Sequence, residues 1–200
     1  MTLKPNKFFL NHYNKKLSGI LGTMCKELRI TKKDIEIKTT PGDLNAVLYI
    51  LQNHSLCLYK QLSEMICIDT PEHKLRFSVT YKLYSMVYNS HIYVVTQTDD
   101  VTPIPSVSQL YSSATWLERE IWDLFGIFFS DNPDLRRILT DYGFQGHPLR
   151  KDFPLTGFVE VYYNDSTKRL AYEPVELAQE YRVMNLESPF NKVTSEKKFK

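Results

Sequence analysis

Cysteine is scarce in this chain, and its spacing excludes the common disulfide and metal frameworks. The 200 residues include three cysteines, Cys25, Cys57 and Cys67, and none of them forms a CxxC pair. An odd number of cysteines leaves no complete disulfide framework, and an iron–sulfur cluster normally takes four cysteine ligands. The five histidines show neither HxxxH nor HExxH spacing, which argues against a zinc site. We therefore expect reduced, mostly buried thiols and no prosthetic group held by this chain.

Other signatures are missing as well. The sequence has no GxGxxG nucleotide fingerprint, no GxxxxGKS or GxxxxGKT phosphate loop and no GxSxG nucleophile elbow. The net charge of +2 is small and evenly distributed, which argues against nucleic acid as a partner. No apolar run approaches the ~20 residues that a membrane-spanning helix needs. We expect a soluble chain with no direct membrane span.

The start of the chain is basic, with Lys4, Lys7, Lys15 and Lys16, but it shows neither an Arg-rich presequence nor a signal-peptide core. We expect a protein that is made in its own compartment or is already processed. The abundance of Lys, Asn, Ile, Phe and Tyr suits an A/T-rich genome and is compatible with organellar encoding.

Residues 1–130 predict a small α+β domain built on a helix-flanked, mainly antiparallel sheet. Helical spacing of apolar residues runs from Leu17 to Leu28, and Asp43 can cap a helix from Leu44 to Asn53, with a further helix expected over residues 56–65. Short strands are expected at 35–37, 65–69, 76–87 and 92–96, and the break at Asn89-Ser90 predicts a hairpin.

The segment from Trp116 to Glu160 is the most informative part of the chain. Its pattern predicts a helix from Trp116 to Phe125, ended by Gly126 in a left-handed cap. Five residues make an apolar arc, namely Leu117, Ile121, Trp122, Leu124 and Phe125, and three gather on the opposite side, namely Arg119, Glu120 and Asp123. Glu118 falls on the apolar arc. It is either buried with a cationic partner or placed at the rim where it reaches water.

Irregular loops rich in charge follow this helix. A turn is expected at residues 132–134, and the prolines at 148 and 154 exclude a helix or a central strand between them. For Asp141 and Asp152, structural ion pairs are expected. Charges this dense beside so many aromatic residues predict a surface that meets a partner chain. The candidate interface residues are Glu118, Arg119, Glu120, Asp123, Arg136, Arg137, Asp141, Arg150, Lys151 and Asp152.

Residues 131–200 are expected to form signature loops followed by an extended, irregular C-terminal segment that wraps a partner. The prolines, a turn at residues 164–167 and aromatic side chains such as Tyr163, Tyr172 and Phe190 do not describe an independent core. The polar, lysine-rich end from Thr194 to Lys200 is expected to be frayed.

The stretches LEREIWDLFGIFF and NPDLRRILTDYGFQGHPLRKDFPLTG resemble the signature of the 30-kDa subunit of respiratory complex I, the NADH:ubiquinone oxidoreductase, in its mitochondrial form. The resemblance is strong from about Ser112 to Phe190 and weaker before. The chain departs from the family pattern at Asn132, where a histidine is usual, and at Tyr162 and Asn164, where an arginine and an acidic residue are usual.

This resemblance implies a structural and assembly subunit without catalytic activity of its own. It would lie in the quinone module of the hydrophilic arm, on the matrix side of the mitochondrial inner membrane. Its implied partners are the 49-kDa subunit and other hydrophilic-arm subunits. The assembly, which carries FMN and iron–sulfur clusters in other subunits, transfers electrons from NADH to ubiquinone and translocates protons.

Two alternatives remain open at the level of sequence. One is the equivalent subunit of a plastoquinone-reducing NAD(P)H dehydrogenase complex or of a related hydrogenase; the extension from Glu173 to Phe190 favours the mitochondrial form. The other is a stand-alone hydrolase that uses Asp141, His147 and Asp152, which activity of the isolated chain would reveal.

Overall fold

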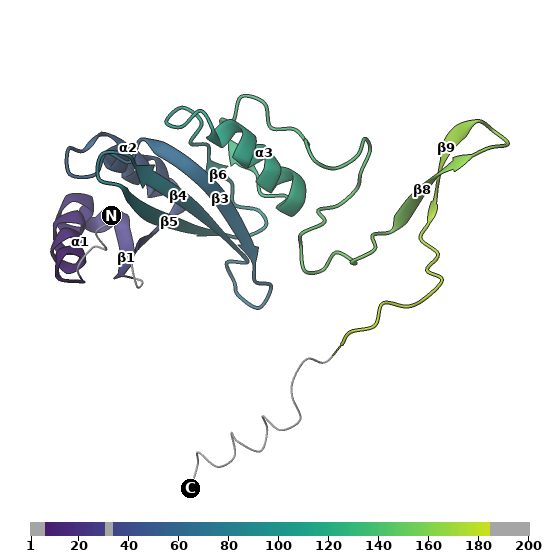
Figure 1. Ribbon diagram of the computed structural model, residues 1–200, viewed down its shortest axis with the longest axis horizontal. Coiled ribbons are helices and arrows are strands. Elements are labelled where there is room, and N and C mark those ends of the chain that lie inside the picture. Colours follow the sequence, from purple (N-terminus) through teal and green to yellow (C-terminus); the bar gives the residue numbers. More distant parts are fainter. Residues whose placement is uncertain (1–6, 31–33, 185–200) are drawn as a thin grey trace, which may run out of the picture. The chain divides into compact units, whose positions relative to one another are not determined.

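The structure, a computed structural model, describes residues 7–30 and 34–184, and its contacts divide the chain into two units, Met1–Leu155 and Thr156–Lys200 (Figure 1). The first unit contains α1 (Lys7–Leu21), η1 (Gly22–Met24), β1 (Cys25–Ile30), β2 (Ile35–Thr39), η2 (Pro41–Asp43), α2 (Leu44–Asn53), β3 (Gln61–Asp69), β4 (Phe77–Ser85), β5 (Ser90–Thr98), β6 (Ile104–Pro105), α3 (Ala114–Phe125) and β7 (Phe129–Ser130). The second unit contains β8 (Val159–Asn164) and β9 (Arg169–Pro174). This division falls later than residue 130, so the signature loops belong to the first unit.

A five-stranded sheet of order β1-β2-β5-β4-β3 organises the first unit, and all its neighbouring strands are antiparallel except the parallel pair β2–β5. The predicted α+β class with a mainly antiparallel sheet is confirmed. The hairpin expected at Asn89-Ser90 is also present, because β4 and β5 pair from Phe77↔Thr98 to Ser85↔Ser90 and Asn89 adopts a φ of +46° in the turn.

Alternation in the strands places one face of the sheet in the core. In β4, Phe77, Val79, Tyr81 and Leu83 are buried, while the residues between them are half-buried. The helix α2 begins and ends at the predicted residues and contributes Leu44, Val47, Leu48 and Leu51 to the same core. Asp43 stands at the N-cap of α2 as predicted, but its side chain makes no capping hydrogen bond. The side-chain cap lies one turn earlier, where the hydroxyl of Thr40 at the start of η2 accepts the N–H of Asp43 at 3.3 Å.

One predicted helix is present but ends early, and another is absent. The helical spacing that reached Leu28 ends at Leu21, because Gly22 adopts a φ of +54° and the chain then enters β1. Residues 56–65 form a turn followed by β3, which pairs with β4 along its length. Their apolar spacing fits a helix locally, but pairing with β4 decides the outcome.

The second unit is more regular than predicted, since β8 and β9 form an antiparallel hairpin around the expected turn. The predictions for Phe190 and for residues 194–200 lie outside the described residues. In the part of the chain that the structure describes, no helix combines the length and apolar character required to cross a membrane.

The three cysteines are free. Cys57 is buried and the other two are half-buried. Burial raises the pKa of Cys67 to about 12, which disfavours a reactive thiolate.

Candidate partner interface

The helix α3 carries the signature motif and ends as predicted. Gly126 adopts a φ of +76°, and its N–H donates to the carbonyl oxygen of Trp122 at 2.9 Å. A left-handed residue at this position costs least when it is glycine. A Cβ at Gly126 would also lie 2.5 Å from Nε2 of His147, so glycine lets the following loop approach the helix end.

The last carbonyl groups of α3 are bound by the signature loop. The carbonyl oxygen of Asp123 lies 3.0 Å from Nδ1 of His147, that of Leu124 accepts the N–H of Leu149 at 3.1 Å, and that of Phe125 accepts from Nε of Arg150 at 2.6 Å. These carbonyls have no partner within the helix. The positive charge of Arg150 also interacts favourably with the negative end of the helix dipole. The loop is therefore tied to the end of α3.

Asp123 is the central anchor of this loop. Its carboxylate is fully buried and accepts the N–H groups of Ile138, Leu139 and Thr140 at 3.1, 2.7 and 2.9 Å. It also accepts from the hydroxyl of Thr140 at 2.6 Å and pairs with Arg137 at 2.9 Å. Burial alone would raise the pKa of Asp123, but these hydrogen bonds outweigh it and hold the pKa well below its usual range. The carboxylate is thus ionised and fixes residues 137–140.

Of the two placements considered for Glu118, the structure shows the buried one. Its partners, however, are not cations. Its carboxylate accepts from the hydroxyl of Ser106 at 2.7 Å, the N–H of Val107 at 2.8 Å and the amide of Asn132 at 2.6 Å. Burial raises the pKa of Glu118, and these neutral donors reduce the rise. The departure from the family pattern at Asn132 therefore supplies a donor that does not titrate.

The side of α3 opposite its apolar arc is only partly solvated, because Arg119 and Asp123 are buried while Trp116 and Glu120 are exposed. Arg119 is 4% exposed; its guanidinium lies 4.9 Å from the centre of the Trp116 ring and donates to the carbonyl oxygen of Arg136 at 3.4 Å. Asp123 on the same side has no exposed surface. Neither of these two candidate interface residues is exposed in the free chain, because residues of the 131–147 loop contact them.

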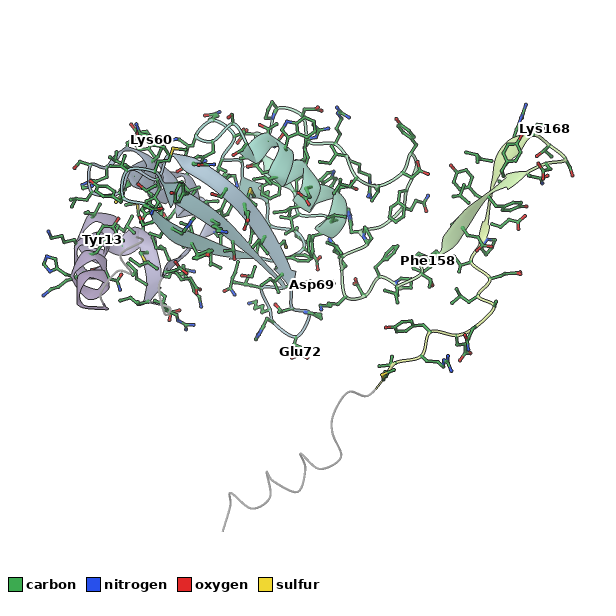
Figure 2. All side chains as sticks on the ribbon, viewed as in Figure 1. Tyr13, Lys60, Asp69, Glu72, Phe158 and Lys168 are labelled. Carbon is green, nitrogen blue, oxygen red and sulfur yellow. The ribbon has the colours of Figure 1, made fainter. Side chains whose placement is uncertain are left out.

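A second set of ion pairs ties the loop to the sheet. Asp69, at the end of β3 (labelled in Figure 2), pairs with Arg76 through both oxygens at 2.7 and 2.8 Å and accepts the N–H of Lys151 at 2.8 Å. Arg76 also pairs with Asp152 at 3.1 Å, as expected for Asp152, and Arg150 pairs with Asp100 at 3.1 Å. Hydrogen bonds from Arg76 lower the pKa of Asp69 despite its burial.

The ten predicted charges therefore have two different placements. Five of them are buried or half-buried and hold the loop and helix together, namely Glu118, Arg119, Asp123, Arg137 and Arg150. The other five are exposed, namely Glu120, Arg136, Asp141, Lys151 and Asp152, and of these Asp152 pairs with Arg76. Asp141 accepts the N–H of its neighbour Tyr142 rather than showing the expected ion pair. Large apolar side chains are exposed among these loops: Trp116, Phe128, Leu139, Tyr142, Leu149 and Leu155.

Sequence reasoning missed Asp69, Arg76 and Asp100. Asp69 and Lys151 are 82 positions apart, and no local pattern links them. Lys151 lies in a turn, and it is the folding of the loop against the sheet that brings its N–H to Asp69.

The hairpin of the second unit has one apolar face. The cross-strand pairs Val159↔Pro174, Val161↔Tyr172 and Tyr163↔Leu170 lie on one side, and the pairs Glu160↔Glu173, Tyr162↔Ala171 and Asn164↔Arg169 lie on the other. On the apolar side, Tyr172 is 59% exposed and Leu170 is 64% exposed. Two strands alone are marginally stable in water. This face therefore has the properties of a surface that another chain covers.

The described residues form a small α+β unit and a hairpin with an exposed apolar face, a combination typical of a component of a larger assembly. Comparison with known proteins identifies the family: the model described as "Respiratory-chain NADH dehydrogenase, 30 Kd subunit" matches residues 37–159, and the chain belongs to this family. The resemblance drawn from the signature residues is confirmed.

Relatives match most of the chain. It is 46% identical over 185 residues to NADH-ubiquinone oxidoreductase subunit 9 of Reclinomonas americana, covering 92% of this chain and 91% of that protein. It is 49% identical over 174 residues to an NADH-quinone oxidoreductase subunit of Paramagnetospirillum magneticum, covering 86% and 84%. It is also 43% identical over 173 residues to the mitochondrial NADH dehydrogenase [ubiquinone] iron-sulfur protein 3 of Candida albicans, covering 86% and 62%.

A solved structure supports the fold alone. The trypsin-resistant fragment (1-134) of Nqo5 superposes with a TM-score of 0.52 at 21% identity, over 63% of this chain and 98% of the fragment.

The comparisons and the geometry give no support to either alternative. The relatives are named for ubiquinone or quinone. Of the residues considered for a hydrolase, Asp152 pairs with Arg76, His147 contacts the carbonyl oxygen of Asp123, and Asp141 binds the backbone of Tyr142. Each is engaged in a different structural contact.

Proposed function

We propose that this chain is a structural and assembly subunit of the hydrophilic arm of mitochondrial complex I and contributes no catalytic group of its own. The assembly transfers electrons from NADH to ubiquinone and translocates protons, and this chain holds its quinone module together. Membership of the 30-kDa subunit family and the relatives named as ubiquinone oxidoreductase subunits support this proposal.

The exposed apolar face of the β8–β9 hairpin is the observation that carries the proposal. A two-stranded hairpin cannot bury these side chains by itself. Removing apolar surface from water is favourable by roughly 25 cal/mol per Å². A second polypeptide that covers this face would remove it from solvent. We assign that role to the 49-kDa subunit, which the resemblance implies.

The loops anchored on Asp123 and Asp69 provide a second contact with the partner. Their charged groups are already satisfied within the chain, so the loops present a preformed surface that loses little conformational freedom on binding. Exposed residues such as Tyr142, Leu149 and Arg136 are then available to the partner. We place this contact in the matrix-side peripheral arm, with other subunits of that arm as neighbours.

The proposal includes the absence of a prosthetic group in this chain. In the described residues, no group of three or more His, Cys, Asp or Glu side chains is arranged to hold a metal ion. Metal analysis and the visible absorption spectrum of the purified chain should both be blank. Stoichiometric iron with acid-labile sulfide would contradict this part of the proposal.

Truncation after Leu155 tests the proposal, because it removes the second unit at the boundary between the two. The shortened chain should keep the circular dichroism and the unfolding transition of the α+β unit, whose core lies entirely before this point. Its association with the 49-kDa subunit, measured by pull-down beside the full-length chain, should collapse. Capture of the partner at full affinity by a folded, truncated chain would refute the role of the hairpin.

A further inference from the structure

A second exposed apolar surface lies at the turn between β4 and β5. Met86, Val87 and Tyr88 are 72%, 66% and 50% exposed, and Leu56 in the turn after α2 is 41% exposed. We call these four residues the tip surface. Three consecutive apolar side chains exposed at a hairpin turn are unusual, because turns normally carry polar residues and glycine.

Hydrogen bonds hold the tip surface in one arrangement. The hydroxyl of Tyr88 donates to the carbonyl oxygen of Ser55 at 2.7 Å, which joins the β4–β5 turn to the turn after α2. The hydroxyl of Tyr13 in α1 donates to the carbonyl oxygen of Leu56 at 3.1 Å, and Tyr59 and Ser90 join their hydroxyls at 3.2 Å. Three segments that are far apart in the sequence therefore meet at this end of the sheet. A preformed surface loses little entropy when a partner binds.

The segments that form the tip surface carry charge of one sign. The three segments that meet there, residues 12–24, 44–63 and 83–98, contain no Asp or Glu, although the chain has 23 acidic residues among 200. Lys15, Lys16 and Lys60 are exposed in them. An apolar surface bordered by cations and free of acids in its own segments favours an acidic partner by charge complementarity.

The tip surface is separate from the contact proposed above. Figure 2 shows Lys60 and Asp69 at opposite ends of β3, and Asp69 binds the signature loop while Lys60 directly precedes the strand on the side of the β4–β5 turn. Nine extended residues span about 26–30 Å. One partner surface at the Asp69 end leaves the other end available for a different contact.

We propose that the tip surface binds an acidic segment with apolar residues that belongs to a second polypeptide of the same assembly. This inference rests on the proposed function, which places the chain among other subunits. A membrane would also attract the lysines, but four fixed side chains offer little area for insertion, and a single acyl chain already gives only marginal membrane binding. A shaped contact with a polypeptide agrees better with the hydrogen-bonded arrangement of the three segments.

Cysteine accessibility in the purified complex tests the burial of the tip surface. Val87→Cys is placed in the full-length chain, with Val101→Cys, 86% exposed in the β5–β6 connection, as the matched control. Both should react rapidly with a polyethylene glycol maleimide in the free chain. In the complex, Val87→Cys should react at least tenfold more slowly than in the free chain. Equal reactivity in both states would overturn the proposal. Incorporation of the chain into the complex tests the proposed function separately.

Carbodiimide coupling tests the chemistry of the partner. It joins lysine amines to carboxylates in direct contact, so the intact complex should yield a cross-link from Lys60, Lys15 or Lys16 to an Asp or Glu of another polypeptide. Lys60→Glu should reduce retention of that polypeptide about tenfold, whereas Lys60→Arg should retain it. The proposal would be overturned in favour of membrane contact if Val87→Cys is protected from the maleimide only while lipid is present and no carboxylate cross-link forms.

Discussion

The substitution Tyr172→Ser tests the apolar face of the hairpin at its centre. Tyr172 lies opposite Val161 in the register of β8 and β9 and is 59% exposed in the free chain. In the proposed complex its ring is covered by the 49-kDa subunit, so removing it should weaken association while leaving the α+β unit unchanged. The hairpin and that unit are separate compact parts, which confines the effect to binding.

The exposed fraction of Tyr172 gives the magnitude. A buried tyrosine removes roughly 150–250 Å² from water, and 59% of that area is about 90–150 Å² that a partner can still cover. At ~25 cal/mol per Å² the loss is about 2–4 kcal/mol if coverage is complete. Dissociation constants should then rise roughly 40- to 500-fold, since every 1.4 kcal/mol is about tenfold.

The matched control is Tyr162→Ser on the opposite face of the same hairpin. Tyr162 pairs with Ala171, and its hydroxyl donates to Glu173 at 2.6 Å. Calorimetric titration of both variants against the 49-kDa subunit should show an effect for Tyr162→Ser within about threefold, typical of surface substitutions. Equal losses for the two variants, or no loss for Tyr172→Ser, would refute the assignment of the binding face.

Further predictions concern the anchored loop. Asp123→Asn should reduce the free energy of unfolding by about 3–5 kcal/mol in urea titrations, because it leaves a buried network without its charge. Since the folded pKa of Asp123 lies below its unfolded value, this advantage of the wild type should be complete at neutral pH and shrink as pH falls below about 4; an advantage independent of pH would contradict it. Gly126→Ala should destabilise the chain by at least about 1 kcal/mol and speed proteolysis of the loop. The control Gly143→Ala should have a smaller effect, because Gly143 also has a positive φ but a Cβ there would have no atom within 4 Å. Equal effects of the two substitutions would count against the close contact between Gly126 and His147. Arg137→Glu should lower the thermal midpoint of the free chain, whereas Arg136→Glu, whose side chain is 66% exposed, should leave it unchanged and weaken assembly on native gels; normal assembly would remove Arg136 from the interface.

Local physical chemistry accounts for the features that sequence reasoning predicted correctly. The helix from Leu44 to Asn53 follows from apolar spacing, and the end of α3 follows from the left-handed preference of Gly126. The β4–β5 hairpin follows from two alternating runs separated by a short turn. The strict alternation of Val159, Val161 and Tyr163 also carried the signal for β8, although the prolines nearby favoured an irregular segment.

Pairing between distant segments decided the features that were predicted wrongly. Residues 56–65 have an apolar pattern compatible with either structure, and the neighbouring strand β4 selects the extended one. Glu118 shows the same limit in the site. Its burial follows from its place on the helix arc, but the identity of its donors, Ser106 and Asn132, depends on how two loops meet around α3.

The sequence by itself determined the family, the α+β class and the position of the charged signature, because these depend on residue identity and on periodicity within short windows. Only the tertiary structure decided which of the charges serve the chain and which remain for a partner. Asp123 and Arg136 are both charged residues of one motif, yet one is buried beneath five hydrogen-bond donors and the other is exposed. The free energy of a charged group depends on its solvation and on its neighbours in space, and neither is encoded by its position in the motif.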